Sequence, residues 1–129
     1  MFSLTTIMKI ICAKNLKKCS NNNIVKVAGL VILKQRPSTA NGVTFIYLED
    51  ETGIINIICW KDICNRYHKE IILSKLLIVI GRVQCENGTV NVIAKSIYDA
   101  SRLILNKKVN TLIITSNSKI VSYLQKDEI

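Results

Sequence analysis

A chain of 129 residues can form one domain with a buried core, and its 49% hydrophobic and 21% charged residues exclude a disordered protein. No run of about 18 apolar residues occurs, which argues against a membrane-spanning helix. The formal net charge of +9 divides into +4 over residues 1–23, +2 over 24–100 and +3 over 101–129. We therefore expect a nearly balanced central domain between basic flanks, and a basic balance favours polyanionic partners.

Five cysteines occur at irregular spacing without a C-x-x-C pair, and the chain has one histidine, His68. Metal sites need ligands in close pairs, so we expect no metal and no cofactor. We expect free, buried thiols in a reducing compartment, and no secretion signal at the N-terminus.

The N-terminal part, residues 1–23, is predicted to be a basic helical or irregular segment. Apolar residues at helical spacing favour a short helix over Ser3–Lys18. Strand patterns begin at Ile24. The run Ile24–Arg36 is predicted to be a long first strand, in which Gly29 marks a β-bulge or a sharp coil of the strand.

The loop Pro37–Gly42 separates this strand from a second one over Val43–Glu49. A tight turn over Asp50–Gly53 joins the second strand to a third, Ile54–Trp60, so these two strands should form a hairpin.

The following segment, Lys61–Glu70, has apolar residues four apart and is predicted to be a helix. A last hairpin is predicted from Leu76–Cys85 and Thr89–Ile97, joined by an Asn-Gly turn. Three strands, a helix and a hairpin make an all-β fold with short helices: a five-stranded oligonucleotide/oligosaccharide-binding (OB) barrel over residues 24–100, with the helix between strands 3 and 4. Residues 101–129 form a polar tail of uncertain structure that contains an apolar cluster, Val109–Thr115.

Several motifs support a more specific resemblance. They are V-x-V-A-G-L-V at Val25–Val31, Q-R-P at Gln35–Pro37, F-x-x-L-E-D-E-T-G at Phe45–Gly53, W-x-D at Trp60–Asp62, and the segment Val79–Ile97. Together they resemble the C-terminal OB domain of bacterial DNA polymerase III alpha subunits, most closely the error-prone, DnaE-type polymerase. The shorter F-x-x-L-x-D-x-x-G signal is shared with anticodon-binding OB domains of aminoacyl-tRNA synthetases.

The resemblance implies a bacterial, cytoplasmic protein that binds nucleic acid in DNA replication or repair. The polymerase family carries its catalytic carboxylates in a palm domain that is absent here, so we expect no enzymatic activity and no catalytic residues. The expected ligand is single-stranded DNA, with RNA or tRNA as an alternative. A protein-interaction module that contacts a polymerase or another replication or repair protein, and a remnant without function, are further alternatives. We expect no membrane partner.

Nucleic acid crosses strands 2 and 3 of an OB barrel, and strand alternation predicts which side chains it meets there. Ile46 and Leu48 should face the interior, which leaves Phe45 and Tyr47 outward as stacking platforms. The hairpin turn sets Tyr47 opposite Asn56. The predicted nucleic-acid-binding residues are Lys34, Arg36, Phe45, Tyr47, Asn56, Trp60, Arg82 and Lys95.

Each of these residues also has a structural interpretation. Phe45 can cover the end of the barrel, Tyr47 can be an ordinary exposed tyrosine, and Trp60 can plug the core. Ile54 and Ile58 share the outward face of strand 3 and favour a protein partner. The lysines of the N-terminal segment, including Lys17, are expected to be a solvated surface rather than a binding site.

Overall fold

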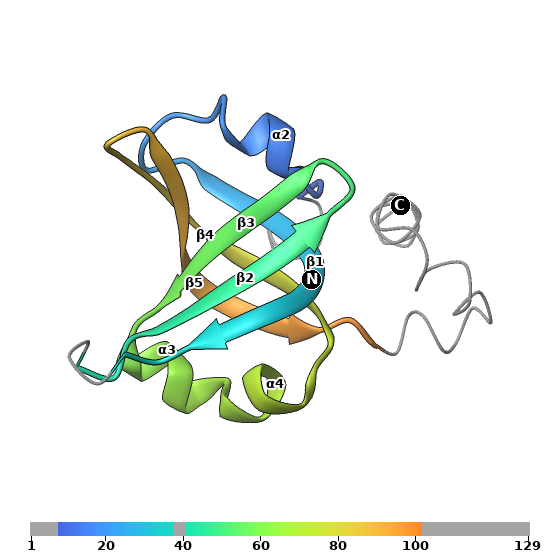
Figure 1. The fold of residues 1–129 in the computed structure, drawn as a ribbon, viewed down its shortest axis with the longest axis vertical. Helices are drawn as coiled ribbons and strands as arrows, with labels where there is room; N and C mark the ends of the chain where they lie inside the picture. Colours follow the sequence, from blue (N-terminus) through green and yellow to red (C-terminus); the bar gives the residue numbers. More distant parts are fainter. Residues whose placement is uncertain (1–7, 38–40, 102–129) are drawn as a thin grey trace.

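The computed structural model of the chain describes residues 8–37 and 41–101. Five strands close into a barrel in the order β1-β2-β3-β5-β4 (Figure 1). Their bounds are Ile24–Gln35 (β1), Thr44–Asp50 (β2), Gly53–Cys59 (β3), Leu76–Glu86 (β4) and Thr89–Asp99 (β5). Neighbouring strands are antiparallel except β3 and β5, which pair in parallel. The predicted OB barrel is confirmed.

The first strand closes the barrel by pairing with two partners. It pairs with β4 over Ile24–Leu30 and with β2 over Leu30–Gln35. Gly29 lies where the partner changes, and a Cβ atom there would lie 2.8 Å from the carbonyl oxygen of Glu49. The predicted bulge is present but lies between Val31 and Leu33, so the role of Gly29 is to let two backbones approach closely.

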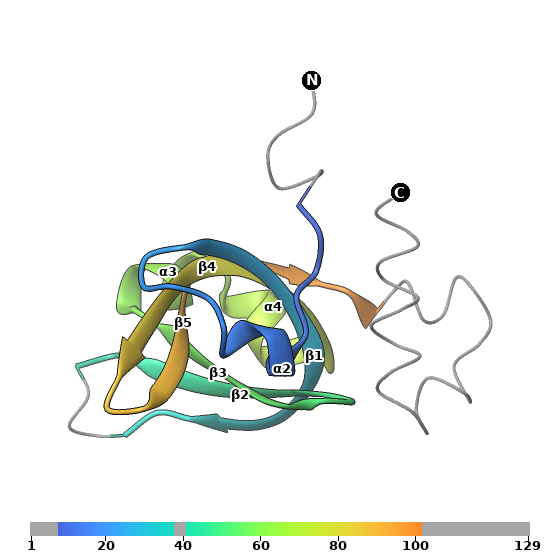
Figure 2. The same cartoon turned by 90° about the horizontal axis from the view of Figure 1, so that it is seen from above.

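Short helices cover the two ends of the barrel (Figures 1 and 2). Helix α2, Ala13–Leu16, covers one end, and α3, Lys61–Arg66, with α4, His68–Leu73, covers the other. The predicted N-terminal helix is wrong over residues 8–12, where Ile10 instead forms a parallel bridge with Lys26. The backbone N–H of Ile11 donates to the Lys26 carbonyl at 2.8 Å, a long-range contact that the local apolar spacing does not reveal.

The predicted helix after β3 is confirmed, as two short helices that meet at Tyr67 and extend to Leu73. Ile63 and Tyr67 are half-buried against the core, and Ile71 is buried. The apolar face of this helical segment therefore covers the barrel, as the four-residue spacing predicts.

The core follows strand alternation. On β2 and β3 the side chains of Ile46, Leu48, Ile55 and Ile57 are at most 1% exposed. The β4–β5 turn has Asn87 at φ 52° and Gly88 at φ 79°, the left-handed conformations that the Asn-Gly pair predicts.

The five cysteines are free thiols; Cys59 and Cys64 are buried, whereas Cys85 is exposed. Within residues 8–37 and 41–101, no helix has the length and hydrophobicity to cross a membrane. The apolar cluster Val109–Thr115 and most of the polar tail lie outside the described residues.

Candidate nucleic-acid interface

The two aromatic residues of β2 point out of the barrel. Ile46 and Leu48 are fully buried, whereas Phe45 and Tyr47 alternate with them and are half-buried. Tyr47 pairs with Asn56 and Phe45 with Ile58 across the hairpin. The predicted orientation and register of the hairpin are therefore confirmed.

Following the pairing of Tyr47 across the sheet reveals a row of amides. Asn56 of β3 pairs with Asn91 of β5, which pairs with Gln84 of β4. Paired residues share a face of the sheet, so these side chains project on the same side as Tyr47. We call Asn56, Asn91 and Gln84 the amide row; all three are half-buried. Each amide can donate and accept hydrogen bonds, which suits base edges and phosphate oxygens alike.

A second row runs beside the first through Phe45. Phe45 pairs with Ile58, Ile58 with Ile93, and Ile93 with Arg82. This row is apolar until it ends at a guanidinium on β4. The two rows together form the outer surface of β2, β3, β5 and β4, here named the strand face. It offers the half-buried side chains of Phe45, Tyr47 and Ile58, neutral amides and the guanidinium of Arg82, whereas Ile93 is only 7% exposed.

The turn between β2 and β3 fixes one end of the strand face. Asp50 is 3% exposed, and its carboxylate accepts hydrogen bonds from Thr52 N, Thr52 Oγ1, Gly53 N and Ala13 N at 2.7–3.1 Å. The last of these bonds attaches α2 to the hairpin. Thr52 Oγ1 also accepts from Lys14 N at 3.0 Å. Asp50 therefore serves as a local cap and as an anchor for the N-terminal segment.

Helix α2, held in this way, forms one wall of a depression of about 390 Å³ at the end of the strand face. Its lining residues are Ala13, Leu16, Lys17, Ile54, Asn56, Gly88, Thr89 and Val90. Asn56 belongs both to the amide row and to this depression, so the two surfaces are continuous. Lys17, expected from the sequence to be merely solvated, supplies a cation to the lining.

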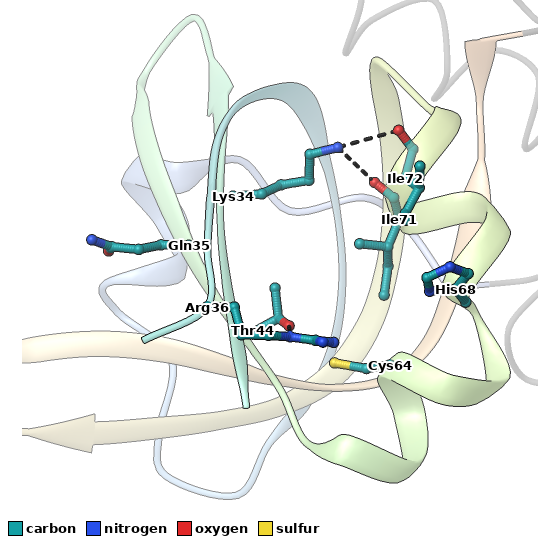
Figure 3. A pocket seen from close by; sticks show the side chains of 8 residues that line it. All are labelled: Lys34, Gln35, Arg36, Thr44, Cys64, His68, Ile71 and Ile72. Carbon is teal, nitrogen blue, oxygen red and sulfur yellow. Dashed lines mark hydrogen bonds between the residues drawn. The ribbon is translucent and has the colours of Figure 1, made fainter. Parts of the chain in front are cut away.

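Two of the predicted basic residues lie on the other side of the β1–β2 pair. Lys34 pairs with inward-facing Ile46, and its Nζ donates to the carbonyl oxygens of Ile71 and Ile72 at 3.1 and 3.2 Å. Arg36 donates through Nε to Thr44 Oγ1 at 3.3 Å. Figure 3 shows both side chains directed towards α3 and α4, whereas Gln35 points away. The structure therefore does not bring Lys34 and Arg36 together with Phe45 and Tyr47.

The remaining predicted residues lie around the strand face. Arg82 is half-buried and donates from Nη1 to Asn22 Oδ1 at 2.9 Å. Trp60 precedes α3 and is 51% exposed, so it is not a core plug. Lys95 is exposed on β5. It lies at an irregularity of the β4–β5 pair, where Ile80 pairs with Ser96 and Gly81 with Ala94.

Sequence reasoning missed Asn91 and Gln84. Both residues could have been found from the expected fold. In an OB barrel β3 pairs with β5, and polar residues at alternating positions of the last hairpin share the outward face. What the sequence does not give is the register of the parallel β3–β5 pair, which depends on contacts between segments about 35 residues apart.

Near the helical end of the barrel two thiols lie close together. Cys64 Sγ donates to the Cys59 carbonyl oxygen at 3.3 Å. Burial, and secondarily the neighbouring Cys64, raise the pKa of Cys59 to about 12. Within the described part of the chain, no group of three or more His, Cys, Asp or Glu side chains could hold a metal ion.

The sequence profile of the OB-fold nucleic acid binding domain matches residues 25–100, which includes every strand of the barrel apart from Ile24. The chain belongs to the OB-fold nucleic acid binding domain family. This OB domain is also similar to parts of larger proteins. It is 42% identical over 99 residues to an error-prone DNA polymerase of Pseudomonas syringae pv. tomato, covering 77% of this chain and 10% of the polymerase.

A similar match, 39% identical over 95 residues, relates it to error-prone DNA polymerase 1 of Rhizobium meliloti, covering 74% of the chain and 8% of the relative. The chain thus spans about a tenth of the length of these relatives. The resemblance to error-prone polymerases predicted from the motifs is confirmed.

Solved structures agree on the fold. Asparaginyl-tRNA synthetase from Pyrococcus horikoshii superposes with a TM-score of 0.62 at 20% identity, covering 72% of this OB domain and 23% of the synthetase. The protein ygiW from E. coli gives a TM-score of 0.54 at 14% identity, covering 71% and 90%. At these identities the likeness is one of fold.

Proposed function

We propose that this OB domain is a non-catalytic module that binds single-stranded DNA on its strand face with little sequence preference. The observation that carries the proposal is the continuous outward surface in which Tyr47 and Phe45 adjoin the amide row. Aromatic side chains stack on any base and contribute about 1–3 kcal/mol per base. The amides supply hydrogen bonds without fixing a sequence, because each can act as donor or acceptor.

The charges around the strand face suit a strand of phosphates. Arg82 lies on β4 at the end of the row through Phe45, Lys95 is exposed on β5, and Lys17 lines the depression beside α2. Basic side chains at the rim bind the backbone and release counterions, so affinity should fall as salt rises. The relatives are DNA polymerases by name, which supports DNA as the ligand and a polymerase or another replication or repair protein as the partner.

The test is fluorescence anisotropy with a labelled thymidylate 12-mer at about 50 and 200 mM salt, a range over which phosphate contacts weaken strongly. The wild-type chain is compared with Phe45→Ala/Tyr47→Ala. Tyr98→Ala is the matched control, because Tyr98 is an exposed tyrosine of β5, level with Ile78 and beyond both rows. We expect salt-sensitive binding, at least a tenfold loss in the double variant and an unchanged affinity in the control.

Two other outcomes of this experiment would have different meanings. Binding that falls with salt yet ignores both aromatic residues would place the DNA on the basic flanks instead. The absence of binding at both salt concentrations would contradict the nucleic-acid proposal.

A protein-binding role is the second candidate, because Ile54 is 44% exposed and Ile58 lies in the apolar row. Under this alternative the strand face packs against a partner polymerase. Phe45→Ala would then weaken partner binding in a pull-down assay while leaving the anisotropy of labelled DNA unchanged.

RNA is an alternative ligand, because it has the same phosphate and base chemistry as DNA. The D-x-x-G turn, which is similar to that of the synthetase OB domains, supports this alternative. Comparing deoxyuridylate and uridylate 12-mers in the same assay distinguishes the two, since these strands differ only in the 2′-hydroxyl. We expect the DNA strand to bind at least as tightly as the RNA strand.

A further inference from the structure

A second cationic pocket lies between the end of β1 and the helices α3 and α4, away from the strand face. Figure 3 shows the eight side chains that line it: Lys34, Gln35, Arg36, Thr44, Cys64, His68, Ile71 and Ile72. Its volume is about 260 Å³. Pockets for drug-sized ligands are commonly about 300–1,000 Å³, so this one suits a smaller ligand.

The mouth of the pocket is positively charged. Lys34 and Arg36 are the charged side chains of the lining, and no carboxylate is among the eight residues. The absence of an internal counter-charge leaves this site favourable for an anion.

The hydrogen bonds fix these cations in place. The two bonds of Lys34 Nζ to the α4 carbonyl oxygens hold the ammonium over the helix end and use two of its three donors. The bond from Arg36 Nε to Thr44 Oγ1 orients the guanidinium plane and involves none of the four Nη–H groups. Preorganised donors of this kind bind a phosphate with little ordering cost.

The floor of the pocket is apolar, which narrows the class of ligand. Cys64 and Ile71 are 3% and 7% exposed, and Ile72 forms an exposed side of the lining. An inorganic anion would leave the apolar side chain of Ile72, which is 52% exposed, uncovered. A ligand that combines a phosphate with a compact organic group would cover this side chain and meet the cations together.

We propose that this pocket binds one nucleotide, with its phosphate at Arg36 and Lys34 and its base against the exposed side chain of Ile72. The inference rests on the proposed function for the source of that nucleotide, a strand that continues past the end of β1 from the strand face. The pocket lies on the opposite side of the β1–β2 pair from Phe45 and Tyr47, so the two sites can be separated by experiment.

The test is a titration of the 15N-labelled full chain with thymidine 5′-monophosphate, followed by 1H–15N correlation spectra. Ile72→Asp places a carboxylate at the mouth without removing a buried group, because Ile72 is 52% exposed. Leu73→Asp is the matched control: it makes the same change one residue further along α4, at a side chain that is 67% exposed and absent from the lining.

We expect saturable shifts at the amides of Thr44, Cys64 and Ile71, and weaker ones with thymidine or inorganic phosphate alone. Ile72→Asp should reduce the affinity about tenfold, and Leu73→Asp less than about twofold. Shifts that do not saturate, equal losses in the two variants, or equal affinity for inorganic phosphate would overturn the assignment. Retained binding of the mononucleotide by Phe45→Ala/Tyr47→Ala, together with loss of the 12-mer, would show that this pocket is independent of the strand face.

Discussion

At the scale of single residues, Asp50 shows how a position of the family motif can stabilise the fold. The acidic run Glu49–Glu51 contains one buried carboxylate, and all of its hydrogen bonds go to the turn and to Ala13. The D-x-x-G part of the motif is therefore accounted for by the hairpin and its attachment to α2.

Replacing Asp50 tests this role. Asp50→Asn turns one acceptor into a donor that faces backbone N–H groups, so we expect a loss of about 2–3 kcal/mol in the free energy of unfolding. Urea denaturation measures the change. Glu51→Gln is the control because Glu51 is exposed in the same turn, and its effect should stay below about 0.5 kcal/mol. Equal effects would contradict the anchoring role.

The Cys59 thiol gives a prediction about alkaline stability. Its pKa rises from 9.0 to about 12 on folding, so above pH 9 the unfolded chain loses this proton before the folded chain does. The stability contributed by the protonated thiol is complete below pH 9 and falls as the pH rises. From pH 8 to 10 the wild type should lose about 1.4 kcal/mol relative to Cys59→Ala, measured by urea denaturation at each pH. A difference in the free energy of unfolding between the two proteins that stays constant from pH 8 to 10 would contradict this prediction.

At the scale of elements, β1 requires glycine at position 29 because the backbones of β1 and β2 approach closely there. Gly29→Ala would put a methyl group 2.8 Å from the Glu49 carbonyl oxygen, and we expect a loss of about 2–3 kcal/mol. Gly88→Ala meets no atom within 4 Å but must adopt φ 79°, so it should cost about 1 kcal/mol. Thermal unfolding ranks the two, and the reverse order would contradict the close approach of β1 and β2.

The elements also show what the sequence can and cannot predict. Local signals suffice for the hairpins, because turn residues such as Asn87-Gly88 and alternation on β2 act within a few residues. The extended conformation at Ile10 was not predicted, because it depends on pairing with Lys26, which lies beyond a polar break in the sequence. Lys34 and Arg36 were correctly placed before the first loop, but alternation along β1 directs them away from the aromatic pair.

At the scale of the whole molecule, one barrel presents two distinct surfaces. The strand face combines aromatic side chains with amides. The pocket between the end of β1 and the helices α3 and α4 combines cations with apolar side chains. The ends of the barrel are covered by α2 and by α3–α4, as Figure 2 shows. Such an arrangement suits a single strand that passes over the barrel without entering it.

The central claim, that the strand face contacts the bases, is tested most directly by photocrosslinking. A thymidylate 12-mer carrying one 5-iodouracil is irradiated with the chain, and the linked peptide is identified by mass spectrometry. Phe45, Tyr47, Trp60, Tyr67 and Tyr98 are the aromatic residues within residues 8–37 and 41–101. We predict crosslinks at Tyr47 or Phe45 that an excess of unlabelled 12-mer abolishes. Crosslinks confined to Tyr67 or Tyr98 would contradict the account.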